Sequence, residues 1–382
     1  MRKYFHIFAC TFFYSLGANI LGFSMIYRLT DKFLFATGQI GIFLALGSVF
    51  YFLGCNLYHR FGYVLNPVKV YTTAVAIVFL ASLPMGFGSI ALVYASYWIL
   101  QISAGFFWPP IMAHLTAGLG GRELDRVISI YNRSWMAGLL VGPLVSGTIY
   151  NWNSSATFFV LSLSYLTALI FLLVNRKSSA ASSEEKSKNI SSAARNPDRR
   201  LDHYRYQGWV LAFCSSMVIG VIVNMIPIHI RDGLGYTERS AGLILALRCF
   251  AGFVGFTLVA KFSAWHFNRL WFIILHSIIT ACILLFILAG SRIVFFTVLV
   301  FFCGLFNSAC YNNSIFYSSV TGKNPKKNMA LHEIFLALGT AVGAAGGGFF
   351  YQHFGINGVC TALALALGIG LLVLILFNRK LV

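Results

Sequence analysis

Three ionisable residues lie inside long apolar stretches of the sequence, where a charge is costly. Arg133 and Arg248 are cations, and Glu333 is a carboxylic acid. A charge at the centre of a membrane helix costs at least about 2.5 kcal/mol, so each of these residues is a functional candidate by default. Arginine binds carboxylate and phosphate groups, and a buried carboxylic acid can take up and release a proton. The set predicts binding of an anion together with proton transfer.

Each of the three also has a structural alternative. Arg133 lies about five residues from the expected end of its helix, so its side chain could instead reach the membrane interface. Arg248 lies near the middle of its helix and cannot easily do so, which favours binding. Glu333 could instead form a salt bridge with Arg133 or with a lysine of a loop. His332 stands beside Glu333 and is a second candidate for the proton path, although single histidines on membrane helices commonly serve packing.

Neutral residues near these charges could complete a site for a small molecule. They are Trp108, Tyr131, Asn132, Trp135, Asn307, Tyr311 and Asn312. Amides and rings of this kind bind sugars or aromatic metabolites by hydrogen bonding and stacking. Aromatic residues make up 16% of the chain, so packing between helices is the alternative role for most of them. With two arginines against one glutamate, the site is expected to be cationic and to favour an anionic solute.

The composition predicts an all-α integral membrane protein. Hydrophobic residues make up 58% of the chain and charged residues 10%, against about 25% charged in an average soluble domain. Apolar runs of about 20 residues recur, and the period-two alternation of a membrane barrel is not seen. Twelve transmembrane helices are expected, at about residues 5–27, 37–57, 70–85, 90–117, 131–150, a sixth ending near 175, 208–230, 237–260, 270–289, 293–320, 332–351 and a twelfth ending before 378. Two adjacent prolines, Pro109 and Pro110, are expected to interrupt the fourth.

A repeat with an offset of 201 residues relates the two halves of the chain. Residues 131–150 and 332–351 share a series of glycines and a final tyrosine. The first copy carries Gly138, Gly142, Pro143 and Gly147, and the second carries Gly339, Gly343 and Gly348. Such a repeat indicates two fused halves of six helices, at residues 1–175 and 206–382. A polar, cationic and flexible linker is expected at residues 176–205.

The positive charges of the chain are distributed unevenly between the two expected sides of the membrane. The formal net charge is +18, which invites a nucleic-acid interpretation, but the basic residues lie at helix ends. Of the 28 lysines and arginines, 21 fall on the side of the N-terminus, 5 on the other side and 2 within the membrane. This asymmetry predicts that both termini are cytoplasmic. The bilayer, not a nucleic acid, is the expected partner of the chain.

No chemistry that needs a metal, a cofactor or a catalytic set is indicated by the sequence. The eight cysteines fall in apolar runs without a CxxC pair, so they are expected to be buried and to form neither disulfides nor a metal site. No phosphate-binding loop of the Walker type is present, which argues against ATP hydrolysis. No clustered catalytic set such as HExxH is present either. We therefore expect no enzymatic activity and no cofactor.

Twelve helices in two similar halves, joined by a basic loop, resemble the major facilitator superfamily (MFS) of secondary transporters. The resemblance covers the whole chain. After its second helix the family carries a glycine, an acidic residue, a basic residue and a further glycine. Here Gly54 and residues 59–62 (HRFG) are similar to that pattern, with His59 where the acidic residue is expected. Because His59 replaces that acidic residue, the sequence gives no support for the charge–dipole latch that this loop forms in the family.

The glycine series of the fifth helix, with Pro143, is similar to a motif of antiporters in the family, although small residues spaced by four also serve plain helix packing. On a helical wheel Tyr131, Trp135, Gly138 and Gly142 share one stripe, and Arg133 lies about 140° from Gly138. The glycines are therefore expected to pack on a neighbouring helix while the arginine faces elsewhere.

The resemblance implies alternating access, with the helices of the three ionisable residues lining a central cavity. The expected function is proton-coupled transport of a small anionic organic solute, by a monomer in a bacterial cytoplasmic (inner) membrane. Whether the direction is uptake or efflux, and symport or antiport, stays open. A drug or lipid efflux antiporter of the same fold is the alternative, and it would call for a wide apolar cavity. A non-transporting receptor or a membrane-embedded enzyme is a more remote one.

Overall fold

The structure is a computed structural model that describes residues 4–119, 121–174, 202–262, 264–289, 292–321 and 325–379. All regular secondary structure in these ranges is helical, as predicted. The elements are α1 (Phe5–Asp31), α2 (Thr37–Arg60), η2 (Gly62–Val64), α3 (Pro67–Ser82), η3 (Leu83–Gly86), α4 (Ile90–Gly105), α5 (Trp108–Thr116), α6 (Gly121–Trp152), α7 (Ser154–Val174), α9 (Asp202–Ile228), η5 (His229–Gly233), α10 (Glu238–Lys261), α11 (Arg269–Ala289), α12 (Ile293–Val320) and α13 (Pro325–Arg379).

Ten segments within the described ranges are long and apolar enough to cross a membrane, which makes the chain a multi-pass membrane protein. Twelve were predicted, and the difference lies in α6 and α13. The 32-residue α6 is more polar than the other long helices and is not among the ten. The 55-residue α13 counts once, although its backbone bends at Gly355, where φ is 62°. This left-handed conformation favours glycine, which has no Cβ to clash with the backbone.

Local sequence signals explain where several helices begin and end. The side chain of Asn66 accepts hydrogen bonds from the backbone N–H groups of Val68 and Lys69, and Pro67 occupies the first turn, so α3 starts three residues before the predicted position. The predicted interruption at Pro109 and Pro110 is confirmed, because α4 ends at Gly105 and α5 begins at Trp108. Most of the predicted linker, residues 176–201, lies outside the described residues, and its last four residues are the start of α9.

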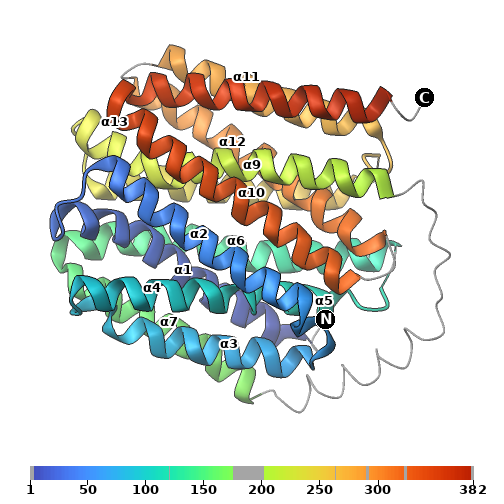
Figure 1. The fold of residues 1–382 in the computed structure, drawn as a ribbon, viewed down its shortest axis with the longest axis horizontal. Coiled ribbons are helices and arrows are strands. Elements are labelled where there is room, and N and C mark those ends of the chain that lie inside the picture. Colours follow the sequence, from blue (N-terminus) through green and yellow to red (C-terminus); the bar gives the residue numbers. More distant parts are fainter. Residues whose placement is uncertain are drawn as a thin grey trace.

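The helices form two groups, α1–α7 and α9–α13, which are blue to green and yellow to red in Figure 1. Their long axes run roughly side by side, and the first and last described residues lie at the same end of the bundle, on the right of Figure 1. We call this the termini end. The eight cysteines are buried and unpaired.

Glycines set the closest helix contacts, both within the groups and between them. Within the groups, a Cβ on Gly138 of α6 would strike the carbonyl oxygen of Phe12 in α1, and a Cβ on Gly339 of α13 would strike that of Phe213 in α9. The expectation that the glycine stripe of α6 packs on a neighbouring helix is confirmed by this contact. These positions need glycine because two helix backbones meet there.

Between the groups, α2 packs on α13 and α6 packs on α10. A Cβ on Gly41 would lie 2.6 Å from the carbonyl oxygen of Ala344 and 2.9 Å from the Cα of Gly348. A Cβ on Gly242 would lie 2.5 Å from the carbonyl oxygen of Pro143. Both contacts lie toward the end of the bundle opposite the termini, so the two groups are closely packed there.

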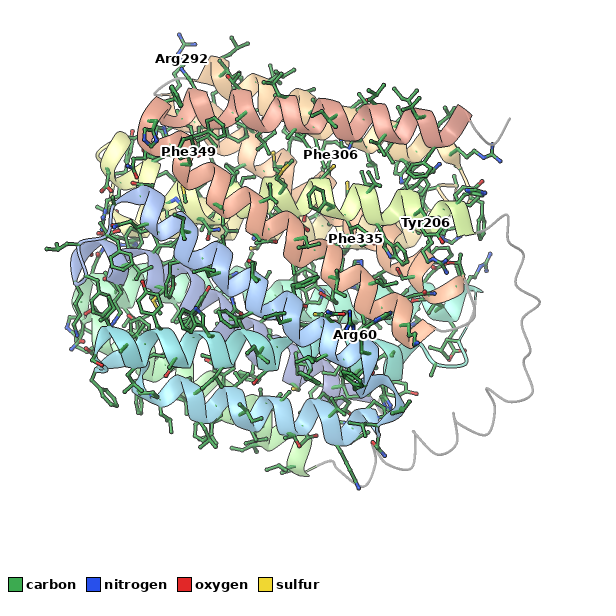
Figure 2. The ribbon with its side chains drawn as sticks, in the orientation of Figure 1. Arg60, Tyr206, Arg292, Phe306, Phe335 and Phe349 are labelled. Carbon is green, nitrogen blue, oxygen red and sulfur yellow. The ribbon has the colours of Figure 1, made fainter. Side chains whose placement is uncertain are left out.

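Apolar side chains cover much of the outer surface of the bundle (Figure 2). Phe349 is 54% exposed and Leu365 is 69% exposed, as large side chains that face lipid would be. The basic residue Arg60 and the aromatic Tyr206 lie near the termini end, and Arg292 lies at the opposite end (Figure 2). This distribution suits a protein whose sides contact hydrocarbon and whose ends contact water.

Candidate functional site

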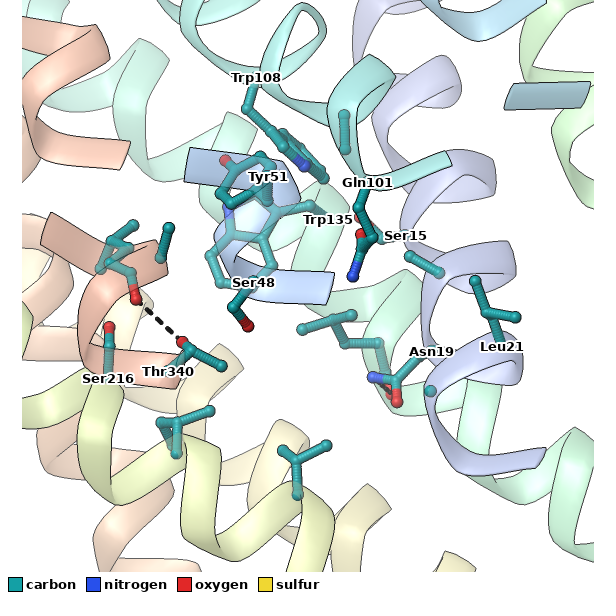
Figure 3. Close-up of a pocket in the computed structure, with 18 of the residues that line it drawn as sticks. Ser15, Asn19, Leu21, Ser48, Tyr51, Gln101, Trp108, Trp135, Ser216 and Thr340 are labelled. Carbon is teal, nitrogen blue, oxygen red and sulfur yellow. Dashed lines mark hydrogen bonds between the residues drawn. The ribbon is translucent and has the colours of Figure 1, made fainter. Parts of the chain in front are cut away.

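A cavity of about 390 Å³ lies in the interior between the two groups and takes side chains from both (Figure 3). The α1–α7 group contributes aromatic residues and neutral polar residues, chiefly Tyr14, Asn19, Ser48, Tyr51, Tyr97, Gln101, Trp108, Trp135 and Tyr165. The α9–α13 group contributes Ser216, Arg248, Asn307, Tyr311, Glu333 and Thr340. Most of these residues lie near the middle of their helices, which places the cavity at mid-depth of the bundle, whereas Trp108 is the first residue of α5.

Arg248 of α10 is a buried cation on the cavity wall. Only 5% of the residue is exposed, and no ion pair joins it to a carboxylate among the described residues. Its Nη2 contacts the thiol of Cys249 at 3.2 Å, and its Nε has no hydrogen-bond partner in that part of the chain. A buried guanidinium without a counter-ion is costly, and a bound anion would offset that cost.

Glu333 of α13 lies in the same cavity and joins the two groups. The hydroxyl of Tyr51, in α2, donates a hydrogen bond to Oε2 of Glu333 at 2.6 Å. Glu333 is 5% exposed, and the structure shows no ion pair between it and Arg133 or a described lysine. The predicted alternative of a structural salt bridge is therefore not seen. A buried carboxyl that touches the cavity and bonds across the groups can exchange a proton with a solute or with water.

A second layer of polar residues lies next to the cavity on the side of the termini end. Asn132 of α6 donates from Nδ2 to Oδ1 of Asn312 in α12 at 3.2 Å, and it accepts from Nε1 of Trp135 at 3.1 Å. The Nδ1 of His332 lies 2.7 Å from the hydroxyl of Ser314. These contacts hold α6 against α12 and α12 against α13, between the cavity and the termini end.

The predicted site residues divide into two sets by their place in the structure. Six line the cavity: Trp108, Trp135, Arg248, Asn307, Tyr311 and Glu333. Five are not among its lining residues: Tyr131, Asn132, Arg133, Asn312 and His332. Of these five, Tyr131 is fully buried and packs edge-on against Trp108, with ring centroids 6.3 Å apart. Contact of this second set with a solute stays a prediction.

Arg133 is partly exposed and turns back along its own helix. Its Nε donates to the carbonyl oxygen of Ser129 at 3.3 Å. Because Gly138 faces α1, the rotation of α6 is fixed, and Trp135 and Leu139 are then the α6 residues that reach the cavity with Met136. Arg133 is not among the lining residues, and because α6 begins at Gly121 it is the thirteenth residue of its helix and lies farther from the helix end than expected. Both of its predicted roles stay predictions.

Sequence reasoning found Trp108 and Trp135 but missed the other residues of the neutral half of the cavity wall. Asn19 and Gln101 are polar residues in apolar helices, and the insertion argument used for charges would have flagged them. Asn19 donates from Nδ2 to the carbonyl oxygen of Leu139 at 3.1 Å, across α1 and α6. Tyr51 gave no signal, because a tyrosine in an apolar helix is ordinarily a packing residue.

An ionic cluster closes the end of the bundle opposite the termini. Arg231 in η5 bonds Asp31 of α1 at 3.0 Å and Asp232 at 2.7 Å, and Glu238 lies 3.6 Å away. Nearby, the backbone N–H of Gly38 donates to the side-chain oxygen of Gln352 at 2.9 Å. Both sets of contacts join the two groups, as the glycine contacts of α2 and α6 do at the same end.

A smaller polar contact joins the groups at the termini end. Nε2 of His266, in the connection between α10 and α11, lies 3.6 Å from Oδ1 of Asp125 in α6. Partial burial lowers the pKa of the His266 imidazole, and the nearby Asp125 carboxylate opposes that shift. The His266 ring also stacks on Phe316, with centroids 4.3 Å apart.

A family model described as Major Facilitator Superfamily matches residues 7–329, and no curated protein sequence matches. The fold is similar to that of the human organic anion transporter MFSD10 (TETRAN), with a TM-score of 0.69 and 14% identity over 98% of this chain and 99% of that chain. It is also similar to a POT family transporter in complex with 5-aminolevulinic acid, with a TM-score of 0.76 and 12% identity over 100% of this chain and 96% of that chain. At these identities the likeness shows the fold alone, but the family model spans most of the sequence, and the chain therefore belongs to the Major Facilitator Superfamily of transporters.

Proposed function

We propose that this protein is a secondary active transporter that moves a small organic anion across the membrane by alternating access, coupled to protons. The observation that carries the proposal is Arg248, a buried cation on the cavity wall without a carboxylate partner among the described residues. Removing one partner from a buried charge pair typically costs 3–5 kcal/mol, so an unpaired guanidinium strongly favours an anionic ligand. The likeness of the fold to a solved organic anion transporter is consistent with this substrate class.

Glu333 is the proposed proton carrier. A charged Glu333 would repel an anion held at Arg248, because both side chains line one cavity. Two like charges inside one buried cavity repel each other more strongly than they would in water, so a charged Glu333 would weaken binding of the anion. Protonation of Glu333 would remove that repulsion. Anion and proton are then expected to bind together, which favours symport.

The hydrogen bond from Tyr51 gives proton binding a route to the conformation of the bundle. It links α2 to α13, and a hydrogen bond to an ionised carboxylate is about twice as strong as one between neutral groups. Proton uptake by Glu333 would therefore weaken a contact between the two groups. Because these groups rock against each other in alternating access, that contact is placed to couple protonation to the movement.

The proposed architecture has twelve membrane spans in two related halves. Adding α6 and dividing α13 at Gly355 brings the ten apolar segments to that number. The contacts of the glycines support the repeat of 201 residues: Gly138 meets Phe12 as Gly339 meets Phe213, and Gly41 meets Ala344 as Gly242 meets Pro143. Each residue of the first contact in a pair lies 201 positions from its counterpart in the second contact. We keep residues 1–175 and 206–382 as the halves and 176–205 as the linker.

We propose that the termini end faces the cytoplasm of a bacterium, as the excess of lysine and arginine on that side favours. The binding cavity lies within one chain, so a monomer is sufficient for transport. The glycine–proline motif of α6 gives antiport no separate support, because Gly138 and Pro143 are already explained by their contacts with α1 and α10.

Transport in proteoliposomes tests the role of Arg248. Purified Arg248→Gln is compared with wild type for uptake of a panel of radiolabelled organic anions under an inward proton gradient. Arg239→Gln is the matched control, because Arg239 is on the same helix and exposed. Loss of uptake in Arg248→Gln alone is expected. Unchanged uptake of every transported anion by Arg248→Gln would contradict the proposed binding role.

A second pair of variants tests proton coupling. Glu333→Gln is expected to keep solute counterflow, which needs no gradient, and to lose accumulation driven by the proton gradient. Glu123→Gln is the control, since Glu123 is exposed at the start of α6. If Glu333→Gln still accumulates solute against its gradient, another group carries the proton.

A further inference from the structure

We propose that the transported solute is an organic anion whose body carries several hydroxyl groups, bound with its anionic group at Arg248 and its body against α1–α7. The inference rests on the proposed function and adds the chemistry of the part of the solute that carries no charge. It follows from how charge, hydrogen-bonding groups and rings are distributed around the cavity.

The charges of the cavity wall all come from one side. Arg248 of α10 and Glu333 of α13 both belong to the α9–α13 group, and no charged residue of α1–α7 lines the cavity. The anionic group of a bound solute must therefore lie against α9–α13. The remainder of the solute must then contact the uncharged wall formed by α1, α2, α4, α5, α6 and α7, where Asn19, Gln101 and Trp108 are found (Figure 3).

The amides of the cavity wall are only partly satisfied by the protein. Nδ2 of Asn19 bonds the carbonyl oxygen of Leu139 at 3.1 Å, and Nδ2 of Asn307 bonds that of Ser215 at 3.3 Å. Because a carbonyl can only accept, these bonds orient both amides. Each amide has two N–H donors and an oxygen acceptor, so one donor and the acceptor are left over in the described structure.

A hydroxyl group is the partner that fits such an amide, because it donates and accepts at the same atom. Gln101, whose Nε2 lies 3.1 Å from the Tyr97 hydroxyl, adds a third amide to the wall. An apolar body would displace water from these amides and leave them unpaired at low dielectric, which is unfavourable. The cavity is therefore expected to prefer a hydroxylated anion to its deoxygenated analogue.

The size and the rings of the cavity agree with a small, compact body. Its volume of about 390 Å³ is toward the lower end of the roughly 300–1,000 Å³ of small-molecule sites. The rings of Tyr14 and Trp108 meet edge to face, with centroids 5.3 Å apart, on the uncharged side. Such rings can pack against the C–H faces of a polyhydroxylated body while its hydroxyl groups reach the amides.

Matched pairs of anions test the inference on the purified full-length protein. Affinities are measured from ligand-dependent shifts of the thermal unfolding midpoint for glycerate and propionate, gluconate and hexanoate, and quinate and cyclohexanecarboxylate. Each pair shares its charge and carbon skeleton and differs in hydroxyl groups. Glucose supplies hydroxyl groups without the charge. We expect the hydroxylated member of at least one pair to bind about tenfold or more tightly than its partner, and tighter than glucose.

Variants assign the preference to the amides. Asn19→Leu and Gln101→Leu, both on the α1–α7 wall, are expected to reduce the ratio of the two affinities to threefold or less, whereas Asn357→Leu, an exposed control on α13, keeps it. Equal or tighter binding of the deoxygenated anions in all pairs, with dependence on Arg248, overturns this inference and leaves the proposed function standing. If both cavity variants retain the preference for the hydroxylated anion, the assignment of the hydroxylated body to the α1–α7 wall is wrong. Binding of glucose as tight as that of gluconate overturns the anionic substrate itself.

Discussion

Closure of the bundle at the end opposite the termini should depend on Gly41. This residue of α2 meets α13 without a side chain, and Gly41→Ala would place a methyl group 2.6 Å from the carbonyl oxygen of Ala344. Ordinary contacts begin at about 3.4 Å, so α2 and α13 would have to separate by about 0.8 Å to accept the methyl group. In a conformation in which this end is open, the helices are apart and the methyl group costs nothing.

The expected size of the effect follows from the cost of overpacking. Inserting a methyl group into closely packed elements costs about 1–3 kcal/mol. The cost applies to the closed conformation alone, so the ratio of open to closed molecules at this end should rise by about 5- to 150-fold. Closure should become the slow step of the transport cycle, and the rate of transport should fall while the fold is retained.

Distances between spin labels measure this equilibrium directly. Lys32→Cys in the connection after α1 and His353→Cys in α13 place one label on each group at the affected end, and both positions are exposed. The eight native cysteines are buried, which limits labelling elsewhere. Double electron–electron resonance should show a new population at longer distance in Gly41→Ala.

Gly346→Ala is the matched control for that measurement. It lies on α13, two residues from Gly348, and a Cβ there meets nothing within 4 Å. It should leave the distance distribution as in the labelled parent. The reasoning is refuted if Gly41→Ala also leaves the distribution unchanged, or if Gly346→Ala shifts it equally.

Three further variants have expected outcomes. Tyr51→Phe removes the hydrogen bond to Glu333, so the pH dependence of the spin-label distances should shrink, and a full pH response would exclude this coupling route. Gly138→Ala should lower the thermal unfolding midpoint relative to Gly346→Ala, because its methyl group meets the backbone of Phe12, and equal midpoints would contradict the packing argument. The folded protein lowers the pKa of His266 below its ordinary 6.5, so its protonation favours the unfolded state and stability should be lost as the pH falls below about 6.5. His266→Gln should lose less stability between pH 7 and pH 5, and an identical loss would assign the acid sensitivity to other groups.

Helix positions could be predicted from the sequence because hydrophobic length is a strong signal in a membrane protein. The break between α4 and α5 followed from Pro109 and Pro110, which cannot donate backbone hydrogen bonds. The bend at Gly355 was harder, since a glycine between two apolar runs fits a loop as well as a kink. The early start of α3 depends on a capping bond of Asn66, which adds little to any hydrophobic pattern.

The candidate site could be predicted only in part, because composition identifies costly residues and not the direction in which a helix faces. Arg248 and Glu333 were found because a charge in hydrocarbon demands an explanation, and both line the cavity. The same reasoning selected Arg133, which turns back to Ser129. The rotation of α6 is set by the contact of Gly138 with α1, a tertiary contact between residues far apart in sequence.

The placement of Arg248 and Glu333 on one group constrains how transport could be coupled to protons. If α9–α13 moves as one body, the distance between the two charges stays the same throughout the cycle. Movement therefore cannot switch the proton affinity of Glu333 by bringing Arg248 closer or taking it away. Under the proposed function, two events can still change the proton affinity of Glu333. One is the arrival of the anion at Arg248, and the other is the making or breaking of the hydrogen bond to Tyr51 on the other group. The first would link the proton to the solute and the second would link it to the conformation, and a coupled transporter needs both links to meet at one residue.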